Sequence, residues 1–285
     1  MPATRRVGLI GYPVGHSRSP AMQQAAFDAL GIPAHYVLWE TPPETLAERV
    51  ASLRAPDVLG ANVTIPHKTA VVPLLDALAP SALQAGGAVN TIVRGADGRL
   101  TGHNTDVTGV LRVLDAHGAG DGGQSALALA LGAGGAARAA WAAAHERGMT
   151  LHVAARSVAA AREALSALGL SEAETIALDA PDKLVEALRT SSILINATSV
   201  GMGDPLASPL SAELLAHLPP TALVFDMVYA PPETALLRMA RARGLRVATG
   251  LEMLLEQGAA AFELWTGSPA PIAVMRAALA AHDAE

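Results

Sequence analysis

The chain contains no cysteine, few aromatic residues and few charged residues among its 285 residues. The absence of cysteine excludes disulfides, a thiolate nucleophile and zinc sites with thiolate ligands. Aromatic residues make up only 3% of the chain, which argues against a base-stacking surface for nucleic acid. The 20 Lys and Arg residues against 26 Asp and Glu residues leave a net charge of −6. An acidic chain repels phosphate backbones, so we expect no nucleic-acid partner.

Long uninterrupted apolar runs are also missing from the sequence. The segment MPATRRVGLIGYP has only a short apolar run before Gly11 and Pro13, so we interpret it as a first strand and not as a signal peptide. The most apolar long stretch, SALALALGAGGAARAAWAAA, contains glycine pairs and Arg138, which argues against a membrane span. The nine histidines form no ligand-spaced pair. We therefore expect a cytoplasmic protein with neither a membrane partner nor a bound metal.

Apolar residues are abundant, at 51% of the chain, and they follow an alternating pattern of strands and helices. A length of 285 residues favours about two domains. The alternation is typical of βαβ units and a largely parallel sheet. In the first part of the chain, the expected strands are residues 6–11, 34–40 and 58–63, and the expected helices are residues 19–31, 42–53 and 67–78.

A different pattern separates the two halves of the chain. Two short apolar runs flank GADG at residues 95–98, which predicts a β-hairpin. The polar, glycine-rich segment 115–124 predicts a loop that leads into a second unit. In that unit, we expect strands at residues 125–132, 150–156, 191–198, 222–228 and 244–250, and helices at residues 135–148 and 159–169.

The segment LALALGAGGAAR has the glycine spacing of a dinucleotide-binding loop. Gly132, Gly134 and Ala137 fit Gly-x-Gly-x-x-Gly/Ala between a predicted strand and a predicted helix. The first glycine permits a tight turn, the second lets the backbone approach a pyrophosphate, and the small third residue lets helix and strand pack closely. The helix N-terminus then offers N–H donors to the phosphates. The alternative is a plain tight turn in a chain rich in Ala and Gly.

The end of the next predicted strand indicates which cofactor is bound. A dinucleotide with a free ribose usually meets an acidic residue there, whereas this strand ends in Arg156 and Ser157. Arginine suits a 2′-phosphate through a charge-assisted hydrogen bond, which favours NADP. The alternative is a solvated arginine at a strand end.

The segment ANVTIPHKTA places polar residues directly after an apolar strand. Asn62 lies near the end of the run VLGANV, and Thr64 and Lys68 follow that run. Pro66 between them interrupts strand pairing. One interpretation is a polar turn with Lys68 in solvent. The other is a binding site at the carboxyl end of a sheet. The spacing alone leaves both open.

Eight segments taken together resemble the shikimate dehydrogenases, in the same order and over nearly the whole chain. They are GYPVGHSRSP, ANVTIPHK, GAVNT, GHNTD, GAGGAAR, INATSVGM, FDMVY and GLEMLLEQGAAAFELWTG. The resemblance implies an α/β fold with two domains, in which the C-terminal helices return to the first domain. The expected substrate domain spans residues 1–106 and 250–285, and the expected Rossmann-type NADP domain spans residues 107–249.

The resemblance also implies roles for individual residues. Lys68 and Asp106 are expected to be catalytic, and Ser17 and Ser19 to bind the carboxylate of the substrate. The other residues expected to bind substrate are Asn62, Thr64, Asn90, Tyr229 and Gln257. The residues expected to bind the cofactor are Gly132, Ala133, Gly134, Gly135, Ala136, Ala137, Arg156, Ser157, Thr198, Met227 and Gly250.

The implied reaction is the reversible reduction of 3-dehydroshikimate to shikimate with NADPH. Lys68 would protonate the developing alkoxide, and Asp106 would orient Lys68. The ordinary pKa of lysine is about 10.4. Burial would lower the pKa of Lys68 and a neighbouring carboxylate would raise it, and the sequence leaves the balance open.

Two departures from the family pattern concern the cofactor and the histidine before the Asn-Thr-Asp block. NADP-using relatives often carry Asn before the arginine and a second basic residue three or four positions after it. Here Ala155 takes the place of the Asn before Arg156. Ala159 and Ala160 take the places three and four residues after Arg156, where relatives have the second basic residue, and Arg162 lies further along. NADP preference is therefore expected to be weaker. His103 stands where many relatives have an acid, either as a structural hydrogen-bonding residue or as a titrating group.

Several alternatives remain at this point. A quinate/shikimate or aminoshikimate dehydrogenase would use the same site on a different ring substituent. A folate-type methylene dehydrogenase also pairs a lysine with a dinucleotide domain, but it gives no reason for the two serines of HSRSP. A non-catalytic dinucleotide-binding module would leave Lys68 and Asp106 without a role. The composition is compatible with a monomer or a homodimer.

Overall fold

A computed structural model describes residues 4–119 and 126–282 of the chain. The chain forms two compact units, Met1–Gly109 with Leu255–Glu285, and Val110–Leu254. Their borders fall inside the helices α4 (Thr105–Ala116) and α10 (Gly250–Thr266). The sequence-based borders at residues 106 and 250 lie near the starts of these two helices. Part of the predicted loop 115–124 and the first residue of the predicted strand 125–132 lie outside the described residues.

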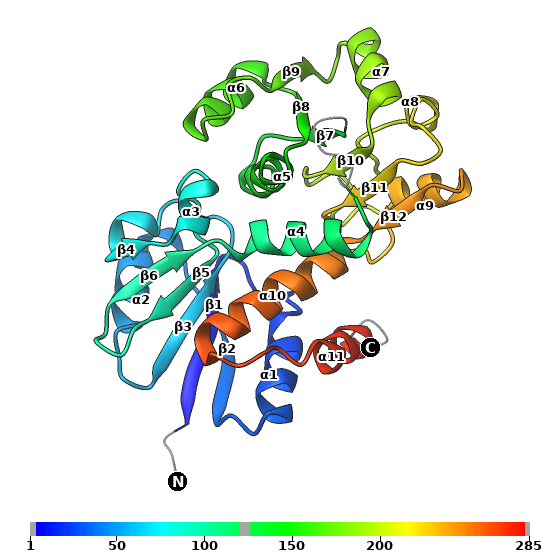
Figure 1. The fold of residues 1–285 in the computed structure, drawn as a ribbon. Helices are drawn as coiled ribbons and strands as arrows, with labels where there is room; N and C mark the ends of the chain where they lie inside the picture. Colours follow the sequence, from blue (N-terminus) through cyan, green and yellow to red (C-terminus); the bar gives the residue numbers. More distant parts are fainter. Residues whose placement is uncertain (1–3, 120–125, 283–285) are drawn as a thin grey trace. The chain divides into compact units, whose positions relative to one another are not determined.

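The first unit is built on a six-stranded sheet in the order β2-β1-β3-β5-β6-β4 (Figure 1). Strand β1 is parallel to β2 and β3, and β4 is parallel to β6, whereas β5 is antiparallel to β3 and β6. The antiparallel pair β5–β6 is the predicted hairpin, which is confirmed. The strands are β1 (Arg5–Gly11), β2 (Ala34–Glu40), β3 (Val58–Val63), β4 (Ala77–Leu78), β5 (Thr91–Arg94) and β6 (Leu100–His103). The helices before α4 are α1 (Ser19–Ala29), η1 (Pro43–Thr45), α2 (Leu46–Ser52), η2 (Val72–Leu74) and α3 (Pro80–Gln84).

The helix predicted at residues 67–78 is wrong. This segment contains only the 3₁₀-helix η2 and the strand β4. Pro73 lacks the N–H that a continuing helix needs. Other parts of the chain also bond the backbone at both ends of this segment, because Val89 N donates to Lys68 O at 2.8 Å and Asp76 N donates to Leu100 O on β6 at 3.0 Å. Pairing with β6 therefore overrides the helical hydrophobic pattern.

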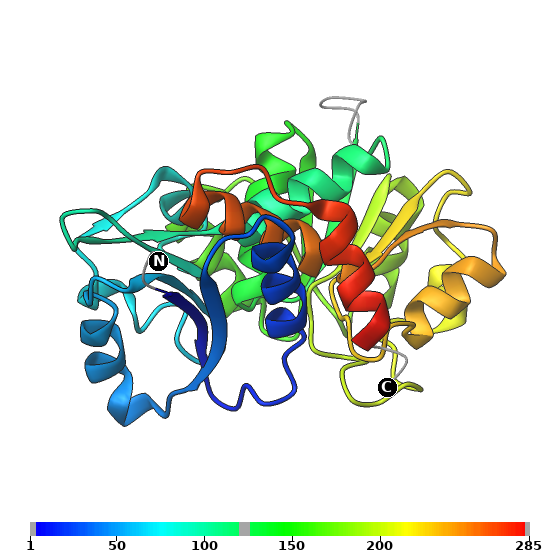
Figure 2. The same ribbon diagram turned by 90° about the horizontal axis from the view of Figure 1, so that it is seen from below.

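The C-terminal helices pack on the first unit. Helix α11 (Ile272–His282) lies beside α1, as Figures 1 and 2 show. On α10, the ring of Phe262 lies 5.1 Å from that of Phe27, and Trp265 Nε1 donates to Ile92 O at 3.0 Å. Gly60 makes room for this tryptophan, because a Cβ there would lie 2.6 Å from its Nε1. The predicted return of the C-terminal helices to the first unit is confirmed.

The second unit contains a six-stranded sheet in the order β12-β11-β10-β7-β8-β9, parallel throughout. The strand order reverses between β7 and β10, as it does in a dinucleotide-binding fold. The strands are β7 (Leu127–Leu131), β8 (Thr150–Ala155), β9 (Glu174–Ala177), β10 (Ile193–Asn196), β11 (Leu223–Asp226) and β12 (Arg246–Ala248). The helices are α5 (Gly135–Glu146), α6 (Val158–Ala167), α7 (Pro181–Thr190), α8 (Ala212–Leu215) and α9 (Ala235–Ala242).

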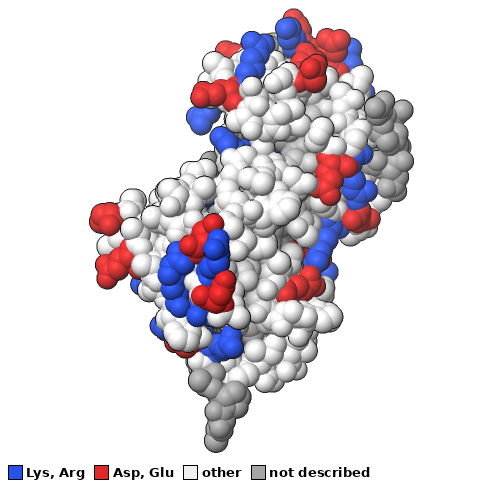
Figure 3. Space-filling view, turned by 60° about the vertical axis from the view of Figure 1, so that its left-hand side comes forward, with Lys and Arg blue, Asp and Glu red and all other residues white. Residues whose placement is uncertain are grey.

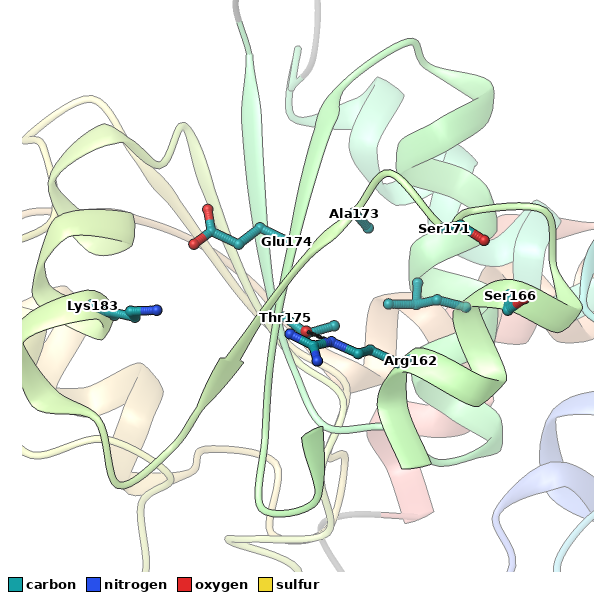
Figure 4. Close-up of a pocket in the computed structure, with 8 residues that line it drawn as sticks. Arg162, Ser166, Ser171, Ala173, Glu174, Thr175 and Lys183 are labelled. Atoms are coloured by element: carbon teal, nitrogen blue, oxygen red, sulfur yellow. Dashed lines mark hydrogen bonds between the residues drawn. The ribbon is translucent and has the colours of Figure 1, made fainter. Parts of the chain in front are cut away.

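Helices cover both sides of this second sheet. At β9, α6 and α7 lie on opposite sides of the strand (Figure 4). The face toward α7, α8 and α9 is filled by apolar side chains from strands and helices alike. Among them are Leu129, Leu131, Leu194, Val224, Leu236 and Leu237, all fully buried. The parallel pairing of the strands brings their carboxyl ends to one edge of the sheet.

Charged side chains lie on the surface in mixed groups. On the face drawn in Figure 3, Lys and Arg side chains are interleaved with Asp and Glu side chains. One ion pair of the surface joins Arg54 to Asp76, at 2.6 Å. In the described parts of the chain, no helix combines the length and the apolar character that crossing a membrane requires.

Candidate functional site

The polar residues predicted in the first half of the chain gather at one edge of the first sheet. Strand β3 ends just after Asn62, and Asn62 pairs with Thr91 at the start of the antiparallel strand β5. Strand β6 ends at His103, which pairs with the same threonine. Helix α4 starts two residues later. The carboxyl ends of β3 and β6 and the amino end of β5 therefore meet at one place.

Lys68 and Asp106 form an ion pair at this edge. Lys68 Nζ donates to Asp106 Oδ2 at 2.6 Å, and their side chains are 20% and 9% exposed. Asp106 lies in the first turn of α4, where the helix dipole favours a carboxylate. Asn104 supports this helix start, because its Oδ1 accepts from Val107 N at 3.1 Å and its Nδ2 donates to Ala88 O at 2.8 Å. The pair keeps an ammonium group in a fixed position with limited access to water.

The buried side chain of Asn90 connects the members of this site. Its Nδ2 donates to Asp106 Oδ1 at 2.9 Å, so both carboxylate oxygens are occupied. Asn90 Nδ2 also donates to Thr105 Oγ1 at 3.0 Å. The other side-chain atom, Asn90 Oδ1, accepts from Thr105 N at 2.7 Å. Gln257 on α10 completes the group, with its Oε1 at 3.5 Å from Asn90 Nδ2. The structure therefore brings together four of the predicted residues, Lys68, Asn90, Asp106 and Gln257.

Asn62 belongs to the same network through a residue that the sequence analysis missed. Tyr36 on β2 donates its hydroxyl to Asn62 Oδ1 at 2.8 Å. Asn62 Nδ2 donates to Asn90 O at 3.3 Å and to Thr91 Oγ1 at 3.1 Å. The sequence signal for Tyr36 is its place in the strand AHYVLWE, where it lies two residues after the buried Ala34 and shares its face.

The serines and Thr64 lie beside this network. Ser19 starts α1 and is buried, and its N–H donates to Ser17 Oγ at 3.2 Å. Thr64 directly follows β3 and lies against Gly11 at the end of β1, where a Cβ would come within 2.4 Å of the threonine methyl. A glycine at this position is what lets the Thr64 segment approach β1.

Two histidines flank the site. His67, which the sequence analysis did not single out, is buried, and its Nε2 lies 2.6 Å from Thr41 O. This contact fixes the turn that carries Lys68. His103 at the end of β6 is half-buried, and burial lowers its pKa below the ordinary value. The neutral imidazole is therefore favoured at neutral pH, whichever role His103 has.

In the second unit, the glycine loop follows β7 and leads into α5. Gly132 has φ +108°, a conformation that L side chains rarely adopt, and a Cβ there would lie 3.0 Å from Thr198 Cγ2. A Cβ at Gly134 or Gly135 would face open space. Gly134 is the N-cap residue of α5, and within the described chain no side chain caps this helix. Helix-end N–H donors beside open space fit a pyrophosphate.

This loop and the first turn of α5 contain six of the residues predicted to bind the cofactor, which are Gly132, Ala133, Gly134, Gly135, Ala136 and Ala137. Ala137 is fully buried, as the close packing of helix on strand requires. The parallel order of the sheet brings the end of β8 next to the end of β7. The residues after β8 therefore lie at the same edge as the loop.

Arg156 and Ser157 directly follow β8. Arg156 is exposed, and Ser157 caps α6 by accepting from Ala160 N at 3.2 Å. Arg162 has another partner, because its Nε donates to Thr175 Oγ1 on β9 at 2.8 Å (Figure 4). Thr175 pairs with Val153, two residues before the end of β8. The guanidinium of Arg162 is thus held back from the carboxyl edge where Arg156 lies.

A pocket of about 470 Å³ lies at β9 (Figure 4). Its lining includes Arg162 and Lys183, together with Glu174 and hydroxyl-bearing side chains. None of the residues predicted to bind substrate or cofactor lines this pocket. We assign no role to it.

The remaining predicted cofactor residues lie after β10 and β11 and at the start of α10. Thr198 donates through N and Oγ1 to Asn196 Oδ1, at 3.1 and 2.7 Å. Gly250 is pressed against the chain after β11, where a Cβ would lie 2.6 Å from Met227 O. Tyr229, predicted to bind substrate, is half-buried in this same unit.

Asp226 at the end of β11 organises these segments and was not predicted. Its carboxylate is fully buried and accepts from Asn196 Nδ2 at 2.9 Å, Thr234 Oγ1 at 2.6 Å and Val228 N at 3.0 Å. Burial raises the pKa of Asp226 above the ordinary value, and the three hydrogen bonds oppose this shift. Its partner Asn196, the last residue of β10, accepts from Thr198, and its partner Val228 directly precedes Tyr229.

No group of three or more His, Cys, Asp or Glu residues that could hold a metal ion occurs among residues 4–119 and 126–282. The carboxylate of Asp106 is already paired with Lys68 and Asn90.

Comparison with known proteins identifies the family. Residues 9–92 match the family model described as the shikimate dehydrogenase substrate binding domain, and residues 250–280 match the shikimate 5′-dehydrogenase C-terminal domain. The chain is 45% identical over 279 residues to the shikimate dehydrogenase (NADP(+)) of Geobacter metallireducens, covering 96% of this chain and 95% of that protein. The chain belongs to the shikimate dehydrogenase family. It is also 43% identical to the shikimate dehydrogenase (NADP(+)) of Symbiobacterium thermophilum, over 99% of this chain and 96% of that protein.

Solved structures of shikimate dehydrogenases share the fold. The crystal structure of shikimate 5-dehydrogenase from Thermus thermophilus, in complex with NADP(H) and shikimate, matches with a TM-score of 0.85 and 40% identity. The match covers 98% of this chain and 99% of that chain. The family resemblance inferred from the eight sequence segments is therefore confirmed.

The buried carboxylate of Asp226 gives a testable pH dependence of stability. Its native pKa lies above the ordinary aspartate value, so the native state binds the proton more tightly than the unfolded state. Stability is then lost as pH rises from the ordinary value through the raised native pKa. We expect Asp226→Asn to remove this loss, so that the variant gains stability relative to wild type as pH rises through that window. Urea unfolding of both proteins across the acidic range measures this, and a difference that is constant with pH would contradict it.

Proposed function

We propose that the chain catalyses the reversible, NADPH-dependent reduction of 3-dehydroshikimate to shikimate. The observation that carries the proposal is the ion pair of Lys68 with Asp106, at 2.6 Å, inside a network of buried amides and hydroxyls. A positioned ammonium group beside hydroxyl-binding side chains suits proton transfer to a ring oxygen. The curated relatives of this chain are named for this activity.

Lys68 handles the proton of the reacting oxygen in this proposal. In the reductive direction, its ammonium group gives a proton to the developing alkoxide. In the oxidative direction, its amine takes the proton of the substrate hydroxyl. Asp106 orients Lys68 through their ion pair, and Asn90 prevents the carboxylate from turning away. The nicotinamide supplies or accepts the hydride when the cofactor is bound.

The other residues of the first unit bind the substrate in this proposal. Ser17 and Ser19 take the carboxylate at the start of α1, where a helix N-terminus favours an anion. Asn62, Thr64, Asn90 and Gln257 bind ring hydroxyls. Tyr229 stays a predicted substrate-binding residue. The first unit is thus the substrate domain, in line with the description of the family model that matches residues 9–92.

The second unit is the NADP domain in this proposal. The loop from Gly132 to Ala137 holds the pyrophosphate, supported by its open space and uncapped helix end. Arg156 pairs with the 2′-phosphate, and Ser157, Thr198, Met227 and Gly250 line the rest of the cofactor. A monomeric or homodimeric state and a cytoplasmic location stay predictions.

Initial rates followed at the NADPH absorbance band test the proposed function. Purified protein is assayed with shikimate and with quinate, each with NADP⁺ and with NAD⁺. We expect the highest kcat/KM for shikimate with NADP⁺. Higher kcat/KM with quinate would favour the quinate/shikimate alternative, and cofactor binding without turnover of any pair would favour the non-catalytic module.

The role of Lys68 predicts a large loss of turnover on its removal. Lys68→Ala should lower kcat by roughly 10²–10⁴-fold, the usual contribution of general acid–base catalysis. The matched control is Lys183→Ala, which removes an exposed lysine on α7 and should leave kcat unchanged. A Lys68→Ala enzyme with wild-type kcat would exclude this role.

Arg156 and Arg162, which both follow β8 in the chain, are expected to differ in their effect on the KM for NADP⁺. Arg156→Ala should raise the KM for NADP⁺ about ten- to a hundredfold, because a charge-assisted hydrogen bond contributes about 1.5–3 kcal/mol. The KM for NAD⁺ should not change, since NAD⁺ lacks the 2′-phosphate. Arg162→Ala is the control and should alter neither value, because its guanidinium bonds Thr175 instead. Equal effects of the two substitutions on NADP⁺ would contradict the assignment to Arg156.

A further inference from the structure

Tyr36 is a buried side chain that neither the sequence analysis nor the proposed function uses. It lies on β2, and strand β1 separates it from β3, as the sheet order β2-β1-β3 shows (Figure 1). Tyr36 pairs with Val7, and Val7 pairs with Gly60, two residues before Asn62. Because side chains two residues apart on a strand share a face, Tyr36 and Asn62 lie on the same face. The tyrosine ring therefore crosses β1 to reach Asn62.

The ring of Tyr36 is held by its surroundings. Its backbone N–H donates to Gln24 Oε1 at 3.0 Å, and Gln24 Nε2 donates to Ala34 O at 3.1 Å and to Asp28 Oδ1 at 2.8 Å. Its ring centroid lies 6.3 Å from that of Trp265, with a tilted geometry. With backbone and ring fixed, the hydroxyl proton is the part of Tyr36 that can still turn.

The hydroxyl of Tyr36 meets two side chains, Asn62 and Ser19. It donates to Asn62 Oδ1 at 2.8 Å, and the neighbouring Ser19 hydroxyl lowers the pKa of the phenol as a hydrogen-bond donor does. A phenol has one proton to give and lone pairs to accept with, so it can donate to Asn62 and accept from Ser19 at the same time. Burial raises the pKa of the Tyr36 phenol far above its ordinary value, which keeps the proton on the oxygen.

Asn62 has no amide hydrogen left for a ligand. Its Nδ2 donates to Asn90 O and Thr91 Oγ1, so Oδ1 is the atom that can meet a substrate hydroxyl. This same oxygen accepts the proton of Tyr36. The acceptor strength of Asn62 toward a substrate hydroxyl therefore depends on where the Tyr36 proton points.

We propose that Tyr36 is a positioning residue that couples carboxylate recognition by Ser19 to hydroxyl recognition by Asn62. When Ser19 turns its proton to a substrate carboxylate, Tyr36 can turn its own proton to the Ser19 oxygen. Asn62 Oδ1 then has one donor fewer and becomes a stronger acceptor for a ring hydroxyl. Only O–H bonds rotate, no covalent bond changes, and every donor keeps an acceptor. A ligand with both a carboxylate and a ring hydroxyl is favoured over one that has only one of these groups.

The proposal rests on the proposed function, and Tyr36→Phe tests it in the full chain. The substitution keeps the ring and its contact with Trp265 and removes only the hydroxyl. We expect the KM for shikimate to rise roughly three- to tenfold, the usual scale for one lost hydrogen bond, with kcat and the KM for NADP⁺ within about twofold of wild type. The control is Ser191→Ala, which removes a fully buried hydroxyl in the second unit that donates to Ala187 O at 2.7 Å. It should lower stability but leave every kinetic constant unchanged.

The coupling itself is measured in a second background. In a Ser19→Ala enzyme, Tyr36→Phe should change the KM for shikimate by less than about twofold, because the link to the carboxylate is already broken. An equal effect of Tyr36→Phe in both backgrounds would overturn the coupling, and so would a wild-type KM in the single variant. The absence of shikimate turnover by the wild-type enzyme would instead overturn the proposed function together with this inference.

A separate pair of variants tests the link without altering Tyr36, should Tyr36→Phe not fold. The effects of Ser19→Ala and Asn62→Ala on the KM for shikimate multiply in the double variant if the two residues act independently. We expect the double variant to show a smaller increase than that product. A simple product would overturn the coupling.

Discussion

The buried amide of Asn90 must find partners for its donors and its acceptor away from water, and the polar edge of the first sheet is arranged around that requirement. An unpaired buried polar group costs about 1–3 kcal/mol, so partners are needed at each position. Thr105 and Asp106 at the start of α4 supply most of them. Asp106 in turn holds Lys68. The position of the proposed proton-transferring group thus depends on an amide that transfers no proton itself.

A buried carboxylate has the corresponding role in the second unit. Asp226 lies at the end of β11 and accepts from Asn196 at the end of β10 and from Val228 and Thr234 after β11. Its burial is unfavourable for the charged form, and the raised pKa reflects that cost. The hydrogen bonds it accepts define the path of the chain from Asn196 to Thr198 and from Asp226 to Tyr229. Both units therefore place the side chains of their candidate sites through a satisfied, buried polar group.

Most of the strands and the α/β class were predictable because hydrophobic period and turn residues are local properties of the chain. The predicted strands 34–40 and 58–63 agree with β2 and β3 residue for residue. The helix predicted at 67–78 failed because pairing with β6, a strand further along the chain, competes for the same backbone. Strand β9 and helices α7, α8 and α9 were not predicted, and β9 is a short strand at the edge of its sheet.

The sequence alone was enough to infer the family, the glycine loop and the candidate roles of Lys68, Asp106 and Arg156. Each of these inferences rests on short motifs of neighbouring residues, which occur along the chain in the order typical of the family. Which side chains meet became known only from the folded chain. Tyr36 contacts Asn62 across an intervening strand, and Asn90 contacts Gln257 on a helix 167 positions away. Arg162 bonds Thr175, which separates it from Arg156. Hydrogen bonds depend on distance and direction in space, and residues remote in sequence acquire both only when the chain has folded.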